Sequence, residues 1–326
     1  MMNGKLNNAG LIPAGPDIKR FLLTYSVYLV LGALIVSFAM ISPIFLSEAN
    51  IGNFFRQIPT VGIITLGMTM LLITGKVDLS AGSIAAFAGT TAAYLAIKGF
   101  SAPVVIIVAL LIGSFWGFVN GTFITRFQLD SFILTLGTDY MIRGIVLFFT
   151  NGIYVKGVPD WFYNLSNTKV GFNFVFTNTL VFVVLIAGLA YVMNNTRFGR
   201  YCYAVGSNPE AARLSGINIQ RHLVKVFMLE GVLAALAGVL LMSNLNVGAP
   251  SEASGVGLFA MAAAIIGGAA FSGGIGSMSG AVVGIFTLEV FQNGLAVLGL
   301  NSFIQQAVTG SIIIVAVVVD YYRRRH

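Results

Sequence analysis

The sequence is poor in charged residues. Only 9% of its 326 residues are Asp, Glu, Lys or Arg, whereas about a quarter of the residues in a soluble domain are charged. With 57% hydrophobic residues as well, the chain cannot cover itself with a soluble surface, so a soluble globular domain is excluded. The composition predicts an all-α polytopic membrane protein, because helices satisfy their own backbone hydrogen bonds inside a bilayer.

Cysteine and histidine are also scarce. The single cysteine, Cys202, excludes an internal disulfide framework, and both histidines, His222 and His326, fall at predicted cytoplasmic ends. No HExxH motif, cluster of metal ligands or set of nucleophile, base and orienting residue is present. The sequence therefore supports no enzyme activity, cofactor or metal.

A nucleotide-binding motif is missing. No GxxxxGK[ST] pattern occurs in the chain, and Gly75-Lys76 is followed by Val77. The Gly-rich stretch 267–277 resembles a phosphate loop in composition only. It is instead predicted to form a tight cytoplasmic turn between two closely packed helices. We expect that this chain neither binds nor hydrolyses ATP.

What the sequence does contain is a series of long apolar runs. A membrane span needs roughly 20 apolar residues. The first run is long enough to be a retained helix, since the residues before it lack the features of a signal peptide. Ten spans are predicted within one transmembrane domain, 21–320: 21–45, 58–75, 81–97, 103–125, 131–150, 177–194, 223–247, 258–271, 277–299 and 302–320.

The distribution of Lys and Arg predicts the orientation. Ten spans place both termini on the same side. If that side is the cytoplasm, 13 of the 18 Lys and Arg residues lie in inner segments, four in outer segments and Arg143 within a span. This is the bias of cytoplasmic loops, and it explains the net charge of +7 without a nucleic-acid partner. In this orientation residues 1–20 and 321–326 are predicted to be cytoplasmic tails. Residues 151–176 are predicted to form a periplasmic loop.

The longest polar interruption, residues 195–222, lies in the middle of the chain. It is basic, it is predicted to form helix, and the topology places it in the cytoplasm. Because the chain has no nucleotide motif of its own, we interpret this segment as the docking point of a separate ATPase.

Two glycine-flanked breaks indicate a weak internal repeat. Gly75 and Gly82 flank the first break, and Gly248 and Gly255 flank the second with the same spacing. In each half an Asn-Gly pair follows 38 residues after the later glycine. The topology makes the two sets run in opposite directions, so spans 2–5 and 7–10 would be inverted repeats, as in many transporters. Chance similarity is the alternative, since Gly, Asn and Ser are common.

Polar side chains inside the spans are candidates for a solute path, because burying them is costly unless they are paired or hydrated. Asp78 and Ser80 are expected to cap the helix that follows the first break. Asp139 and Arg143, four residues apart, predict an ion pair on one helix face. For each residue the alternative is a hydrogen bond that only holds helices together. The candidate path residues are Asp78, Ser80, Asn120, Asp139, Arg143, Asn293, Gln305 and Gln306.

Several short motifs, spread over most of the chain, carry a resemblance to a known family. They are TGKVDLSAGS (74–83), TRFGR (196–200), AVG (204–206), NPEAA (208–212), RLSGI (213–217), IGG (266–268), SGG (272–274) and QNGL (292–295). From about residue 45 to residue 320, the chain resembles the membrane-spanning permeases of bacterial ABC importers for simple sugars, in the ribose-type branch.

This resemblance implies a type II permease fold, like that of vitamin B12 importers, in the inner membrane. It implies import of a monosaccharide by alternating access. The implied partners are a cytoplasmic ABC ATPase, a periplasmic or lipid-anchored sugar-binding protein, and a second permease copy or paralogue, within membrane lipid. Residues 210–216 would match the short coupling helix that enters a groove on the ATPase. The residues assigned to coupling are Arg200, Asn208, Glu210, Ala211, Ala212, Arg213, Leu214 and Gly216.

One segment departs from the family pattern. Where the family has an acidic Glu-Leu-Asp-Ala run, this chain reads Leu258-Phe259-Ala260-Met261. Two other functions stay open: a permease for another small solute of the same superfamily, such as a branched-chain amino acid or a nucleoside, and a stand-alone secondary transporter. The spans offer mainly amides, which disfavours zwitterions, and they hold little charge for coupling to an ion.

Overall fold

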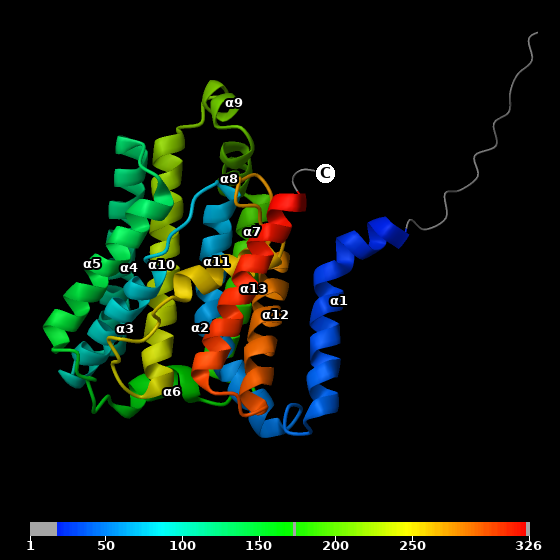
Figure 1. Ribbon diagram of the computed structural model, residues 1–326. Coiled ribbons are helices and arrows are strands. Elements are labelled where there is room, and N and C mark those ends of the chain that lie inside the picture. Colours follow the sequence, from blue (N-terminus) through cyan, green and yellow to red (C-terminus); the bar gives the residue numbers. More distant parts are fainter. Residues whose placement is uncertain (1–17, 172–173, 324–326) are drawn as a thin grey trace, which may run out of the picture.

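The computed structural model describes residues 18–171 and 174–323, and these residues form thirteen α-helices joined by turns and loops (Figure 1). Strand pairing among them is limited to two isolated bridges. The helices are α1 (Ile18–Ile41), α2 (Glu48–Ile73), α3 (Ala81–Ile97), α4 (Ala102–Phe127), α5 (Ser131–Thr150), α6 (Asp160–Asn167), α7 (Thr177–Asn195), α8 (Arg197–Ser207), α9 (Pro209–Leu214), α10 (Ile219–Leu245), α11 (Val256–Ile266), α12 (Met278–Val297) and α13 (Ser302–Arg323).

Each predicted span overlaps one of the longer helices or α11. By length and composition six described helices could cross a membrane, namely α2, α4, α5, α7, α10 and α12. Shorter apolar helices are α3, α11 and the described part of α1 from Val27 to Ile41. The prediction of an all-helical polytopic membrane protein is therefore confirmed.

The two largest boundary errors concern α2 and α11. The predicted run begins at residue 58, but α2 begins at Glu48, where Ser47 Oγ accepts a hydrogen bond from Asn50 N at 3.3 Å. α11 has only 11 residues and ends at Ile266 rather than at residue 271. The first error arises because the start of α2 is rich in amide side chains, which hydropathy does not recognise as part of a span.

Glycines bring the central helices into close contact. α10 packs against α2, α3 and α4. On α4, glycines recur at every fourth position, at Gly113, Gly117 and Gly121. A methyl group added at Gly113 would overlap the carbonyl oxygen of Gly231, and one at Gly117 would overlap that of Phe227. Small residues at such spacing let membrane helices approach backbone to backbone, so the α4–α10 contact is built for tight packing.

The two predicted breaks interrupt the bundle at corresponding places. After α2 the chain returns without helix through residues 74–80, and α3 begins part of the way along the molecule (Figure 1). After α10 it returns through residues 246–255, and α11 also begins part of the way along (Figure 1). α2 and α4 run toward the end that carries α9, whereas α10 and α12 run away from it (Figure 1). The inverted repeat of the two halves stays a prediction.

The beginnings of α3 and α11 touch each other. A methyl group added at Gly82 would overlap the carbonyl oxygen of Ala253, and a Cβ added at Gly257 would lie 3.0 Å from Cα of Leu79. Each break therefore packs directly against the other near the middle of the molecule.

The turn between α11 and α12 brings these two helices together, as predicted. A methyl group at Gly267 would overlap the carbonyl oxygen of Gly280. Gly274, whose φ is +77°, donates its N–H to the carbonyl of Ile73 at 2.8 Å. This hydrogen bond ties the turn to the end of α2.

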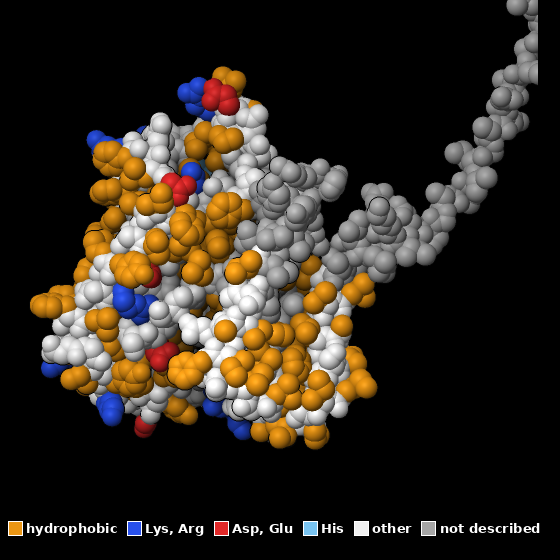
Figure 2. Space-filling model, viewed as in Figure 1, with side chains coloured by type: hydrophobic (Ala, Val, Ile, Leu, Met, Phe, Trp, Pro, Cys, Tyr) orange, Lys and Arg blue, Asp and Glu red, His pale blue; other side chains and the backbone are white. Residues whose placement is uncertain are grey.

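The two ends of the molecule differ. α9 projects beyond the bundle at one end, and the described ends of α1 and α13 point toward that same end (Figure 1). α6 lies across the opposite end, where Phe162 is fully buried and its carbonyl accepts a hydrogen bond from Ser243 Oγ at 2.6 Å. Figure 2 shows hydrophobic side chains spread over the sides of the molecule and charged side chains at the tip of α9.

Candidate functional site

The short helix α9 has a sequence signal at each end. The side chain of Asn208 caps its first turn by accepting a hydrogen bond from Ala211 N at 3.0 Å. Pro209 occupies the first helical position, where a missing N–H costs nothing. Gly216, with φ +83°, ends the segment in a conformation that glycine adopts readily. The predicted segment 210–216 thus overlaps α9, which begins one residue earlier and ends at Leu214.

The outer face of α9 is exposed. Glu210 and Arg213 form an ion pair in which Oε1 and Nη2 lie 2.6 Å apart, and their side chains are 68% and 67% exposed. Leu214 is 81% exposed. An ion pair on the surface contributes only about 0–1 kcal/mol, so little stability is lost if a partner takes its place. The face combines charge with one large apolar side chain, as a docking surface does.

The inner face of α9 is packed against its neighbours. Ala212 is buried in a small cluster with Val205 of α8 and Leu223 of α10. Arg200 lies on the exposed side of α8, where its guanidinium reaches the carbonyl of Asn195 at 3.4 Å. Arg200 was assigned to coupling, but it belongs to α8 and not to α9.

α8 joins α9 to two distant parts of the chain. A methyl group at Gly206 would overlap the carbonyl oxygen of Ile73, the last residue of α2. Tyr203 donates its hydroxyl hydrogen to the carbonyl of Gly276 at 2.9 Å, in the turn before α12. α8 therefore connects α9 to the end of α2 and to the turn before α12.

A buried contact also holds α8 to α10. Cys202 Sγ lies 3.3 Å from Nε2 of His222, and both side chains are buried. Burial raises the pKa of the Cys202 thiol to about 12. A thiol of this kind is unreactive near neutral pH, so Cys202 packs between the helices rather than acting as a nucleophile.

Three candidate path residues, Asp78, Ser80 and Asn120, meet in one buried network. Oδ1 of Asp78 accepts hydrogen bonds from Ser80 N at 2.8 Å and Ser80 Oγ at 2.5 Å, and Oδ2 accepts one from Asn120 Nδ2 at 3.2 Å. All three residues are 0% exposed. Ser80 does stand at the cap position of α3, but its side chain forms no capping hydrogen bond. The predicted capping is wrong because the hydroxyl donates to the buried carboxylate, the stronger acceptor.

α5 satisfies the backbone of the same break. Ser131 Oγ accepts a hydrogen bond from Val77 N at 3.2 Å, and Thr135 Oγ1 accepts one from Leu79 N at 3.0 Å. Buried backbone groups outside helices need such partners. Side chains of α4 and α5 thus hold the first break in place.

The predicted ion pair between Asp139 and Arg143 is wrong. Nη1 of Arg143 instead donates to the carbonyls of Pro250 and Glu252, at 2.9 and 2.7 Å. In the part of the chain that the structure describes, the pair on α9 is the one ion pair. The second break brings unpaired carbonyls next to α5, and these carbonyls take the guanidinium donors.

The other candidate path residues lie on two adjoining cavities. Asn293 and Gln305 line a cavity of about 300 Å³ between α2, α12 and α13. Gln305 and Gln306 line a second cavity of about 420 Å³, which extends to the second break and α11. Gln305 borders both cavities, so the amides predicted in the last two spans come together.

Sequence reasoning left out part of the cavity wall. Asn50, Asn53 and Gln57 line the smaller cavity from the start of α2, and Glu289 and Gln292 of α12 line both. The residues on α2 fell outside the predicted span. Their spacing, i, i+3 and i+7, places the three amides on one face of a helix, and this was the signal that could have revealed them.

Hydrogen bonds fix several of these amides. Asn50 and Asn293 exchange two hydrogen bonds between Nδ2 and Oδ1, of 2.8 and 3.0 Å. Gln305 Nε2 donates to the carbonyl of Leu300 at 2.7 Å. No hydrogen bond or ion pair joins the carboxylate of Glu289 to another described residue. Because an amide carries two donor hydrogens and two acceptor lone pairs, these walls can still bind hydroxyl groups.

The segment that departs from the family pattern lies on this wall. Leu258 and Phe259 line the larger cavity beside Val61 of α2, whereas Ala260 and Met261 are buried. One side of the cavity is therefore apolar where acidic residues were expected by resemblance.

A comparison with known families assigns this helical bundle to the transport permeases. The chain matches the family described as branched-chain amino acid transport system / permease component over residues 50–317, and it belongs to that family.

Three curated relatives cover most of its length. It is 36% identical to the probable ABC transporter permease protein YphD of Escherichia coli K12, over 93% of this chain and 91% of that protein. It is 35% identical to the ribose import permease protein RbsC of Bacillus subtilis, over 90% and 91%. It is 33% identical to the L-arabinose ABC transporter permease protein AraH of Azospirillum brasilense, over 89% and 86%. No solved structure matches the chain.

Proposed function

We propose that this chain is the permease subunit of an ATP-driven importer that moves a monosaccharide into the cytoplasm by alternating access. The observation that carries the proposal is α9, which projects from the bundle, exposes Leu214 and Arg213, and is anchored through α8 to the end of α2. A chain that has no phosphate loop needs an external source of work, and α9 is the part of the molecule shaped to receive it.

The mechanism follows from the contacts that α8 makes with the end of α2 and with the turn before α12. Closure of the partner ATPases on ATP moves α9, and α8 carries the movement to Ile73 and Gly276. These residues adjoin the first break and the turn before α12. Because the two breaks pack against each other at Gly82 and Gly257, the two halves of an inverted repeat rock together and expose the path to alternate sides.

The orientation and partners complete the proposal. The end that carries α9 faces the cytoplasm and, with it, both chain termini, in agreement with the excess of Lys and Arg in the inner segments. The opposite end, which carries α6, receives the sugar from a binding protein. A second permease, identical or related, completes a type II assembly with two ATPase domains in the inner membrane.

The family description favours a second candidate solute, a branched-chain amino acid. The cavity argues for the sugar. Among the described residues that line the two cavities there is no Lys or Arg, so the carboxylate of an amino acid would find no cation. Amides, the Glu289 carboxylate and the ring of Phe54 instead suit a neutral solute with many hydroxyl groups. The names of the ribose and L-arabinose relatives support the same class.

Uptake by two variants tests the proposal. Deletion of residues 210–216, or Arg213→Glu, should abolish ATP-dependent sugar uptake while the protein still inserts in the membrane at the normal level. Arg126→Glu is the matched control, because Arg126 is exposed at the same end of the molecule, in the last turn of α4. Normal uptake by both coupling variants would refute the proposal.

A further inference from the structure

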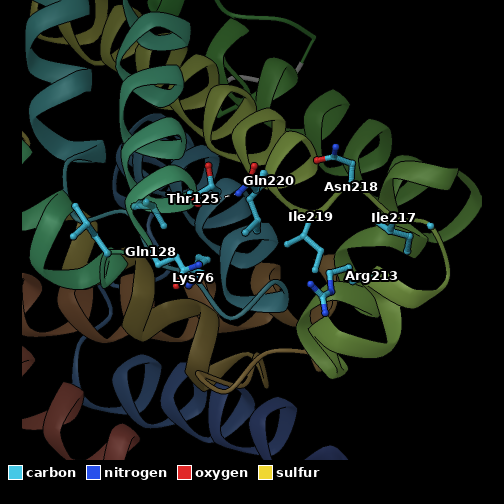
Figure 3. Close-up of a pocket in the computed structure, with 12 residues that line it drawn as sticks. Lys76, Thr125, Gln128, Arg213, Ile217, Asn218, Ile219 and Gln220 are labelled. Carbon is cyan, nitrogen blue, oxygen red and sulfur yellow. Dashed lines mark hydrogen bonds between the residues drawn. The ribbon is translucent and has the colours of Figure 1, made fainter.

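A large pocket beside α9 is lined by Arg213 and Gly216, which were assigned to coupling, and by ten residues that the transport mechanism above does not use. It has a volume of about 660 Å³ and lies where α4 ends, α10 begins and the chain leaves α2 for the first break. Figure 3 shows Lys76 and Gln128 on one side of it, Arg213 on the other, and Gln220 and Ile219 between them. Its size is within the range of roughly 300–1,000 Å³ that small-molecule sites occupy.

The charge of this pocket has one sign. Lys76 and Arg213 are the charged residues of its wall, and no described Asp or Glu belongs to it. Lys76 is half-buried and forms no ion pair with another described residue. Arg213 donates to Glu210 through Nη2, which leaves its Nη1 and Nε donors for a ligand. Cations of this kind in a concave wall attract anions.

The rest of the polar wall provides neutral hydrogen-bonding groups. Thr125, Gln128, Asn218 and Gln220 line the pocket, and Gln220 Nε2 lies 3.4 Å from the carbonyl of Thr125. Side-chain amides both donate and accept, so they pair with hydroxyl groups. Cations together with amides match a ligand that carries an anionic group at one end and hydroxyl groups elsewhere.

We propose that this pocket binds a phosphate ester of sugar size. Lys76 belongs to the first break and Arg213 to α9, so the bound ligand connects the two parts whose relative movement coupling requires. On this geometry a phosphorylated sugar in the cytoplasm slows transport by holding α9 to the break. The binding itself does not depend on the proposed transport function.

Binding to the full-length protein tests the site. In nanodiscs of phosphatidylcholine, ribose 5-phosphate should bind saturably in calorimetric titration, whereas ribose should not. Lys76→Gln should weaken binding by about tenfold or more, since a charge-assisted hydrogen bond is lost. Arg126→Gln removes the same charge from an exposed position outside the pocket wall and should leave binding unchanged.

A second lipid composition distinguishes a soluble ester from a lipid headgroup. If phosphatidylglycerol supplies the phosphate, adding it to the nanodiscs weakens ribose 5-phosphate binding to the wild type, and the Lys76→Gln variant retains less of this lipid in native mass spectrometry. If the soluble ester is the ligand, its binding is the same in both compositions. The proposal is overturned if ribose 5-phosphate does not bind in either composition and both proteins retain phosphatidylglycerol equally. Equal weakening by Lys76→Gln and Arg126→Gln overturns it as well.

Discussion

The two breaks occupy matching places in the two halves of the chain, yet they differ in their surroundings. In the first, Val77 to Ser80 are all buried, and the Asp78 carboxylate accepts three hydrogen bonds. In the second, Ser251 and Ser254 are exposed, and Ser254 lines a cavity. The first break is buried, whereas the second opens onto the candidate solute path.

This difference separates residues that the sequence alone placed in one group. Asp78, Ser80 and Asn120 form the buried network, whereas Asn293, Gln305 and Gln306 line the cavities. A polar residue inside a span can therefore hold helices together or contact a solute, and the exposure of its side chain distinguishes the two roles. The following predictions test the contrast, beginning with the largest effect.

Asp78→Ala should damage folding most. It removes the acceptor of Ser80 N, Ser80 Oγ and Asn120 Nδ2 in a fully buried site. Unsatisfied buried polar groups cost about 1–3 kcal/mol each, so the free energy of unfolding should fall by roughly 3 kcal/mol or more. Thermal unfolding in detergent measures this. Glu252→Ala in the second break is the control, with an expected change within about 0.5 kcal/mol. Equal losses would remove the distinction between the breaks.

Arg143→Ala should destabilise the second break. The variant loses two hydrogen bonds to the carbonyls of Pro250 and Glu252. A hydrogen bond to a charged group contributes about 1.5–3 kcal/mol. Because both bonds come from one nitrogen, Nη1, and the side chain is only partly buried, we expect a combined loss of stability of about 2 kcal/mol in the same unfolding assay. Asp139→Asn should cost less than about 0.5 kcal/mol. If Asp139→Asn costs as much as Arg143→Ala, the two residues form the ion pair that the sequence predicted.

Gln305→Leu should impair transport without impairing folding. Gln305 borders both cavities, so the variant loses one hydrogen bond to the passing solute, worth about 1 kcal/mol. Uptake in proteoliposomes should fall about fivefold. Stability should fall by no more than about 1 kcal/mol, the contribution of the lost hydrogen bond to the carbonyl of Leu300. Ser311→Ala, an exposed position of α13 outside the cavity walls, should transport normally. Unchanged uptake by Gln305→Leu would place the path elsewhere.

Thiol labelling should distinguish the breaks without changing stability or transport. Ser254→Cys should react with a small methanethiosulfonate reagent at pH 7.5, whereas Val77→Cys, at a position 2% exposed, should not. Cys202 gives little background, because its side chain is fully buried and its pKa is raised to about 12. Its reactivity should increase only as the pH approaches that value. Equal labelling at both positions would show that the first break is also open.

The positions of the long helices could be predicted because uninterrupted apolar runs are sufficient to define them. α9 could be predicted as well, since Asn208, Pro209 and Gly216 are local signals. The predictions that failed concerned side chains whose hydrogen-bond partners lie far away in the sequence. The spacing of Asp139 and Arg143 could not reveal carbonyls more than a hundred residues away.

The amide-rich start of α2 was missed for a related reason. A hydropathy pattern records preference for lipid, and it cannot tell that an amide faces a cavity inside the protein. Asn50, Asn53 and Gln57 count as polar in the sequence, although they line the cavity together with Asn293. The family motifs identified the class of protein, but the contact partners of the candidate path residues required the fold.

The most direct test of the account is a cross-link from α9 to the ATPase. Leu214→Cys places a thiol at a position 81% exposed on α9, and Ile153→Cys places one at a position 67% exposed, just after α5 at the opposite end. In the importer assembled in membranes, the account predicts that Leu214→Cys cross-links to the ATPase subunit and that Ile153→Cys does not. A cross-link to the ATPase from Ile153→Cys, with none from Leu214→Cys, would contradict it.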